Sequence, residues 1–229
     1  MSKKAVMVLS GGLDSTTCMG IAKEQGYELY PITFQYGQRH DREVEQAKKI
    51  AVHFGAKDHR IVDVGFFAEI GGSALTDASI AVRKDGAGDD IPSTYVPARN
   101  MIFLSLASAY AEVIGAEKVF IGVSAVDYSG YPDCRPEFIE SMESTVRLAT
   151  KAGVTGKAIE IETPLIRLTK KETVEIGLRL KVPYHLTTSC YLGGDEACGE
   201  CDSCRLRIKG FREAGGIDPI PYAVDVEWQ

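Results

Sequence analysis

Positive charge is scarce in this chain. Its 229 residues include 26 Lys and Arg against 32 Asp and Glu, a net charge of −6. A protein that neutralises several phosphates usually shows a basic field, so this balance argues against broad binding to nucleic acid. Long apolar runs are also missing: the longest, residues 101–116, is interrupted by Ser105, Ser108 and Glu112, whereas a membrane-spanning helix needs about 20 apolar residues. The apolar run that ends at Leu9 is too short for a signal peptide. We therefore expect a soluble, cytoplasmic protein with no membrane or nucleic-acid partner.

Cysteine is rare outside one segment. Of the six cysteines, four fall within 15 residues, at Cys190, Cys198, Cys201 and Cys204. Each Cys-x-x-Cys spacing lets two thiolates converge on one ion, and a set of four thiolates favours a structural Zn²⁺. An iron–sulfur cluster and redox-active cysteines are the alternatives. We expect Cys18 to be a core residue and Cys134 to be a structural thiol rather than a catalytic one.

Strand and helix patterns alternate along most of the chain. Apolar runs at 4–9, 28–36, 59–64 and 118–123 predict buried strands separated by helices. This order predicts an α/β fold with a doubly wound parallel sheet, in which ligands bind at the carboxyl ends of the strands. Residues 158–163 are expected to form an edge strand. We expect residues 1–182 to form the nucleotide-binding domain and 183–229 a small zinc-binding lobe of the same compact unit.

A capping box is predicted at Thr169 and Glu172, and it starts a helix that ends near Leu180. Lys170 and Lys171 open this helix and are expected to be solvated.

One glycine-rich turn joins the first strand to the first helix, with the sequence Ser10-Gly11-Gly12-Leu13-Asp14-Ser15-Thr16-Thr17. A helix N-terminus offers unpaired N–H groups and the positive end of the helix dipole to a phosphate. Glycines let the backbone approach such an anion closely. An ordinary turn with capping residues is the alternative. The turn lacks the lysine and the spacing of a Walker A loop. Asp14 is expected to orient the turn or to bind Mg²⁺.

The same string resembles the pyrophosphate loop, S-G-G-x-D-S, of the N-type ATP pyrophosphatases, which have an adenine nucleotide alpha hydrolase-like fold. The resemblance implies that ATP adenylates an oxygen of the substrate and that pyrophosphate leaves. It also implies catalytic roles for Asp14 and Ser15. The ATP-binding residues that it implies are Leu9, Ser10, Gly11, Gly12, Leu13, Asp14, Ser15, Thr16 and Thr17.

Three further motifs narrow the resemblance. They are Tyr-Gly-Gln-Arg-His at 36–40, Val-Pro-Ala-Arg-Asn at 96–100, and the segment 127–138, which contains Tyr-Pro-Asp-Cys-Arg-Pro-Glu-Phe. With the loop and the cysteine set, they resemble the 7-cyano-7-deazaguanine synthase family of queuosine biosynthesis nearly end to end. The resemblance implies that 7-carboxy-7-deazaguanine and ammonia become the nitrile through an adenylated carboxylate and an adenylated amide, with release of AMP and pyrophosphate. It is also compatible with a homodimer.

Individual roles follow from this resemblance. Arg99 is the third catalytic candidate, because a guanidinium at the sheet edge could bind a phosphate or the substrate carboxylate at two points; a surface ion pair is the alternative. Asp133 and Arg135 are expected to recognise the guanine-type edge, with tyrosines stacking on the ring; packing against the zinc lobe is the alternative. The complete set of substrate candidates is Gln38, His40, Tyr128, Tyr131, Asp133 and Arg135. A capping role for His40 is equally compatible with the sequence.

Two other function classes are weighed against this one. A tRNA-thiolating enzyme of the same superfamily also adenylates an oxygen, but it usually needs a persulfide-carrying cysteine and an RNA-binding module, and this chain is acidic. A non-catalytic interaction protein stapled by zinc leaves the glycine-rich turn unexplained.

Overall fold

The computed structural model describes residues 2–38, 42–82, 91–126 and 130–228. Its centre is a five-stranded sheet in the order β3-β2-β1-β4-β5, with every neighbouring pair parallel. The strands are β1 (Lys4–Val8), β2 (Glu28–Gln35), β3 (Arg60–Asp63), β4 (Lys118–Ile121) and β5 (Glu160–Glu162). The chain switches direction of travel across the sheet between β1 and β4, which is where ligands bind in doubly wound folds. The predicted fold class and the edge position of β5 are both confirmed.

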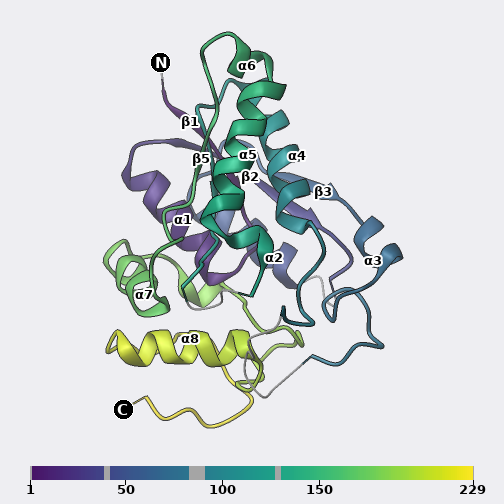
Figure 1. Ribbon diagram of the computed structural model, residues 1–229. Coiled ribbons are helices and arrows are strands. Elements are labelled where there is room, and N and C mark those ends of the chain that lie inside the picture. Colours follow the sequence, from purple (N-terminus) through teal and green to yellow (C-terminus); the bar gives the residue numbers. More distant parts are fainter. Residues whose placement is uncertain (1, 39–41, 83–90, 127–129, 229) are drawn as a thin grey trace.

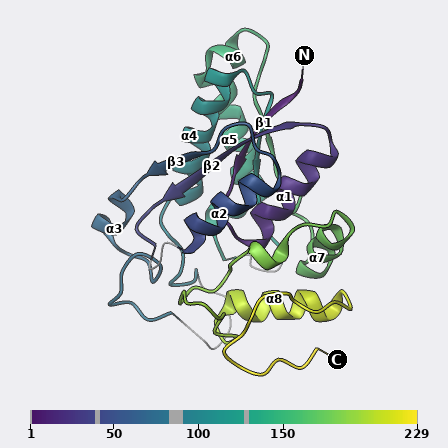
Figure 2. The ribbon, with the colours of Figure 1, turned by 180° about the vertical axis from the view of Figure 1, so that it is seen from behind.

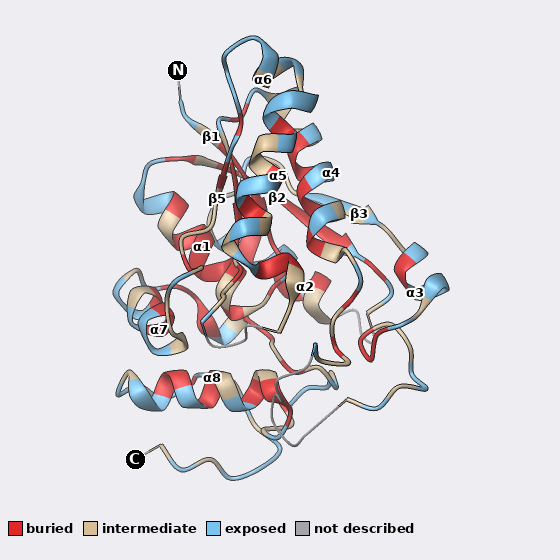
Figure 3. Cartoon of the chain, in the orientation of Figure 1, coloured by how far each residue is buried: buried red, intermediate tan, exposed pale blue. Residues whose placement is uncertain are grey.

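Helices cover both faces of the sheet (Figure 1 and, from behind, Figure 2). Helices α1 (Leu13–Glu24) and α2 (Arg42–His53) pack on one face, in a cluster with Met7 of β1. Helices α4 (Arg99–Ile114) and α5 (Pro136–Ala149) pack on the other, in a cluster with Val6. Neighbouring residues of β1 therefore point to opposite cores, as the two-residue period of a strand requires. Both sides of the sheet are buried (Figure 3).

The remaining helices lie at the ends of the sheet. They are α3 (Phe66–Ile70), α6 (Lys151–Val154), α7 (Lys170–Arg179) and α8 (Asp202–Glu213). The capping box at the start of α7 is confirmed, because Glu172 donates its backbone N–H to Thr169 Oγ1 and accepts the Thr169 N–H. The short helix α6 is absent from the prediction, and Thr150 caps it by accepting a hydrogen bond from Gly153 N.

Helix α8 lies across the carboxyl-terminal edge of the sheet, beside α7 (Figures 1 and 2). After α8 the chain runs back past the cysteine segment, where Ala197 N donates to Pro221 O and Ala223 N donates to Ala197 O. The sequence predicts that Asp41 caps the helix that begins at Arg42 and that residues 81–90 form a surface loop; Asp41 and residues 83–90 lie outside the described residues. Among the described residues, no helix combines the length and the apolar character that crossing a bilayer requires.

Candidate active site

The glycine-rich turn forms a compact loop with its own hydrogen bonds. Ser15 Oγ lies 3.0 Å from Ser10 Oγ and donates to Gly12 O. Thr16 Oγ1 donates to the same carbonyl oxygen, and Thr17 Oγ1 donates to Leu13 O. Among the described residues, no side chain caps the N-terminus of α1, so the positive end of this helix is left for a ligand.

Two glycines allow this loop to sit where it does. Gly11 has φ +82°, and a Cβ built on it would lie 2.4 Å from the backbone oxygen of Glu43 in α2. Gly122, directly after β4, lies against the other side of the loop, because a Cβ there would be 2.8 Å from Ser15 N. Any side chain at either position would displace the loop or the neighbouring element.

A cavity of about 260 Å³ opens beside the loop, at the carboxyl ends of β1 and β4. It is lined by side chains from the loop, from α2, α4, α7 and α8, and from the segments after β2 and β4. The polar and charged residues in its wall are Ser10, Asp14, Ser15, Gln38, Glu43, Arg99, Asn100, Ser124, Lys170, Ser189, Ser203 and Arg207. The apolar and aromatic ones include Tyr36, Leu75, Phe103, Tyr131 and Tyr191. Such a mixture of apolar walls and a few convergent polar groups is typical of a small-molecule site.

Four of the nine candidate ATP residues line this cavity: Ser10, Leu13, Asp14 and Ser15. Thr16 and Thr17 are fully buried and direct their hydroxyls to the loop backbone. Their side chains therefore hold the loop in shape instead of facing a nucleotide.

Lys170 belongs to this site, although it was predicted to be solvated. Its Nζ lies 2.7 Å from Asp14 Oδ1 and 2.8 Å from Asp14 Oδ2. The stem of Lys170 passes close to α8, because a Cβ added at Gly210 would lie 2.5 Å from Lys170 Cγ. The neighbouring Lys171 is exposed and pairs with Glu175, as expected of a solvated residue.

Arg99 is the first residue of α4, and the residue before it, Ala98, has a left-handed backbone with φ +57°. Its guanidinium lies 5.6 Å from the ring centre of Tyr36 and 6.0 Å from that of Phe103. In the described part of the chain, no carboxylate pairs with it. A cation that lines a cavity without an ion pair is suited to bind an anionic ligand.

The substrate candidates fall into three groups. Gln38 and Tyr131 line the cavity. Asp133 and Arg135 do not: Asp133 Oδ2 accepts the backbone N–H of Asn100, and Arg135 is exposed and donates to Pro132 O. His40 and Tyr128 lie outside the described residues.

Cys134 lines the cavity next to Asn100, whose Nδ2 donates to its Sγ over 3.3 Å. Burial, together with the negative charge of Asp133, raises the pKa of the Cys134 thiol to about 12. The thiol is therefore protonated near neutral pH, and a protonated thiol is a weak nucleophile. The sequence predicted a structural thiol at Cys134 but did not predict that it lines the cavity.

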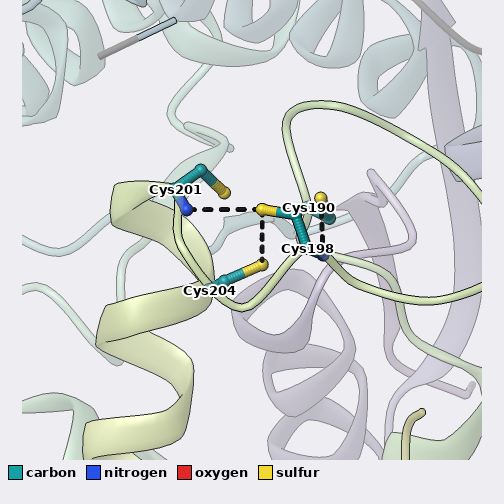
Figure 4. Close-up of side chains that lie close together, drawn as sticks. All are labelled: Cys190, Cys198, Cys201 and Cys204. Atoms are coloured by element: carbon teal, nitrogen blue, oxygen red, sulfur yellow. Dashed lines mark hydrogen bonds between the residues drawn. The ribbon is translucent and has the colours of Figure 1, made fainter. Parts of the chain in front are cut away.

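The four clustered cysteines converge as the spacing predicted (Figure 4). Their Sγ atoms all lie within 4.8 Å of one another, and Cys198 Sγ is 3.9 Å from Cys204 Sγ. A tetrahedral zinc–thiolate site requires sulfur atoms about 3.8 Å apart, given bonds of about 2.3 Å. The backbone N–H groups of Glu200 and Cys201 also point at Cys198 Sγ. The donor set fits a metal ion held by four thiolates.

Comparison with known proteins identifies the family of this chain. The family model of "Queuosine biosynthesis protein QueC" matches residues 4–215. This chain belongs to the QueC family. A 7-cyano-7-deazaguanine synthase from Oceanobacillus iheyensis is 66% identical over 96% of this chain and 98% of its own length. Another, from Desulfitobacterium hafniense, is 58% identical over 96% of this chain and 93% of its own.

A solved structure, that of NMN synthetase from Francisella tularensis, aligns with a TM-score of 0.48 at 16% identity, over 86% of this chain and 67% of that one. This likeness is too distant to indicate function. The family model and the relatives confirm that this chain is a QueC-family enzyme of queuosine biosynthesis.

Proposed function

We propose that this QueC-family chain converts 7-carboxy-7-deazaguanine and ammonia into 7-cyano-7-deazaguanine at the expense of ATP. Relatives that bear the name of that synthase match this chain over nearly their whole length. The observation that carries the proposal is the composition of one cavity. The glycine-rich loop lies at one end of it, Arg99 lies in its wall, and aromatic rings line the remainder.

The chemistry has two similar halves. In the first, a carboxylate oxygen of the substrate attacks the α-phosphorus of ATP, and pyrophosphate leaves. Ammonia then attacks the carbonyl carbon of the acyl adenylate, AMP leaves with the former carboxylate oxygen, and a proton is lost to give the amide. In the second half, the amide oxygen attacks the α-phosphorus of a second ATP, and pyrophosphate leaves again. Loss of both N–H protons and of AMP gives the nitrile. Adenylation is needed because an oxide is a poor leaving group and AMP is a good one.

The loop and Lys170 would bind the polyphosphate. The N-terminus of α1 offers backbone N–H groups and a positive dipole end to the departing pyrophosphate. Asp14 holds the ammonium group of Lys170 at the cavity wall. The charge that develops on the phosphate oxygens would thus meet donors already in place, and such preorganised charge usually contributes more to catalysis than any other single effect.

Arg99 and the aromatic residues would orient the bicyclic acid. A guanidinium can bind a carboxylate at two points, which directs one oxygen at the phosphorus. Tyr36, Phe103 and Tyr131 provide ring faces and edges in the same cavity, and Thr94 fixes the Tyr131 hydroxyl at 2.7 Å. We assign the ring to these residues, together with Gln38, because Asp133 is already engaged by α4.

Two metal ions belong to the proposal. Mg²⁺ would accompany ATP, near the cavity carboxylates of Asp14 and Glu43, and would neutralise phosphate charge when bound. Zn²⁺ would be held by Cys190, Cys198, Cys201 and Cys204 and would stabilise the C-terminal segment. We also propose residues 1–182 and 183–229 as the nucleotide-binding domain and the zinc lobe. The homodimer stays a prediction.

The test is a product analysis with purified protein. We expect sustained consumption of ATP only when both 7-carboxy-7-deazaguanine and ammonia are present, with AMP and pyrophosphate as products. Omission of ammonia should stop turnover after the first adenylation. Release of ADP and inorganic phosphate would contradict the proposed mechanism. ATP consumption that ignores the deazaguanine acid would contradict the proposed substrate.

A further inference from the structure

Arg207 of α8 forms a buried ion pair that the proposed function does not use. Its side chain is 2% exposed, and that of its partner Asp218 is 0% exposed. Arg207 Nε and one terminal nitrogen donate to the two Asp218 oxygens over 2.6 and 2.8 Å. Tyr222 also donates its hydroxyl to Asp218. This pair therefore ties the chain after α8 to the middle of that helix.

The other side of the guanidinium holds a second segment, residues 184–189. Arg207 Nη1 donates to Thr187 Oγ1 over 2.7 Å and to Ser189 Oγ over 3.2 Å. Nη2, which also binds Asp218, donates to the carbonyl oxygen of Tyr184. With the two bonds to Asp218, these contacts account for the five N–H donors of an arginine. Arg207 thus has no donor left for a ligand, although it lies in the cavity wall.

The segment held by Arg207 is in direct contact with the glycine-rich loop. Thr188 N donates to Gly11 O over 3.0 Å. The carbonyl oxygen of Thr188 lies 3.4 Å from where a Cβ on Gly12 would be. The Tyr184 hydroxyl lies 2.8 Å from Thr17 Oγ1 in the first helix. Displacement of residues 184–189 would therefore displace the loop backbone that is proposed to receive the polyphosphate.

We infer that Arg207 is a positioning residue for the nucleotide: it holds residues 184–189 against the glycine-rich loop and so sets the affinity for ATP. The inference rests on the proposed function, because it assumes that the loop binds ATP. The cysteine cluster also links residues 184–189 to α8. The next residue, Cys190, belongs to the cysteine cluster, and Cys201 of that cluster is the N-cap residue of α8. Arg207 joins this framework to the loop through side-chain hydrogen bonds.

A purely structural role predicts something different. If the Arg207–Asp218 pair only stabilised the C-terminal segment, its loss would lower the melting temperature and leave ATP affinity unchanged in the folded protein. A positioning role predicts weaker ATP binding at temperatures well below the melting transition, with the other substrate bound as before. The two roles are therefore separated by affinity and not by stability.

The experiment measures ATP affinity by calorimetry on metal-loaded full-length protein, for the parent and for Arg207→Lys and Asp218→Asn. We expect both variants to bind ATP about fivefold or more weakly, the factor that loss of a hydrogen bond worth about 1 kcal/mol produces. KM for ATP should rise by a similar factor, with KM for the deazaguanine acid unchanged. Metal content should match that of the parent.

Two further variants keep the test decisive. Arg179→Lys alters another arginine–carboxylate pair, between α7 and Glu24 of α1, which is exposed and does not line the cavity; it should bind ATP like the parent. Thr187→Val removes one acceptor of Arg207 and no charge, so it provides the answer if either charge variant fails to fold. Parental ATP affinity in folded Arg207→Lys, Asp218→Asn or Thr187→Val would overturn the inference. Absence of ATP binding by the parent would instead contradict the proposed function.

Discussion

Lys170 and Asp14 are 156 positions apart in sequence, yet the ammonium group of one lies within 2.8 Å of both carboxylate oxygens of the other. The contact joins the N-terminus of α7 to the glycine-rich loop at the start of α1. It places a cation in the cavity wall beside the proposed polyphosphate site. It also explains the one acidic residue in a loop that is proposed to bind an anion: Asp14 orients Lys170.

We predict that Lys170→Met lowers kcat/KM by about 10²–10³-fold, the range typical for loss of one preorganised charge or donor. The variant should fold, because Lys170 is only partly buried and the methionine preserves its stem. Steady-state kinetics with saturating ammonia provide the measurement. Lys171→Met is the matched control, since its lysine is the next residue of α7 and points to solvent. Equal activity of the two variants would contradict the role given to Lys170.

Gly11→Ala should abolish ATP binding. The added methyl group would lie 2.4 Å from the Glu43 backbone oxygen, and the φ of +82° is unfavourable for alanine. Gly26→Ala separates these two effects, because Gly26 has the same φ of +82° and no described residue has an atom within 4 Å of the added carbon. We expect Gly26→Ala to cost about 1–2 kcal/mol of stability from backbone strain and to bind ATP normally. Calorimetric titration with ATP, together with thermal melts, distinguishes the outcomes; normal binding by Gly11→Ala would show that the loop is not the nucleotide site.

Arg99→Lys should raise KM for the deazaguanine acid by about 10- to 100-fold, as expected for loss of a charged, two-point hydrogen bond. Lysine keeps the charge and loses the planar pair of donors. KM for ammonia should not change. Arg147→Lys, on the exposed side of α5, is the control, because this arginine bonds only to Ser144 among the described residues. An unchanged KM for the acid in Arg99→Lys would show that Arg99 does not bind the substrate carboxylate at two points.

Cys198→Ser should remove the bound metal and lower the melting temperature. Cys198 Sγ is close to Cys204 Sγ and accepts hydrogen bonds from backbone N–H groups. Loss of this thiolate would leave three sulfur ligands for the metal. We expect elemental analysis to find a single zinc ion per parent chain and little in the variant. Cys18→Ala is the matched control, since Cys18 is buried in the core beside α2 and outside the cluster. Full zinc retention by Cys198→Ser would contradict the four-thiolate site.

Much of the fold could be predicted because it depends on local patterns. Apolar strands that alternate with capped helices identify a doubly wound sheet, and the close spacing of Cys198, Cys201 and Cys204 identifies a candidate metal site. The glycine-rich loop is predictable for the same reason: its residues are adjacent in sequence.

The rest of the site depends on contacts between distant segments. Whether Lys170 or Lys171 faces the loop depends on how α7 is rotated, which the capping box does not determine. Arg207 is one of four basic residues in α8, and only its buried pairing with Asp218 distinguishes it from the others. Asp133 was assigned to the substrate because a carboxylate can accept hydrogen bonds from a guanine-type edge, whereas one of its oxygens accepts the backbone N–H of Asn100 at the start of α4.

Adenylation requires that oxygen pass from the substrate to AMP, and this transfer can be followed with an isotope. We would supply 7-carboxy-7-deazaguanine with ¹⁸O in both carboxylate positions, together with ammonia and unlabelled ATP, and analyse the products by mass spectrometry. Adenylation of the carboxylate and then of the amide predicts two AMP molecules for each nitrile, each with one ¹⁸O in its phosphate, and unlabelled pyrophosphate. Label in inorganic phosphate, or AMP without label, would contradict the proposed adenylation.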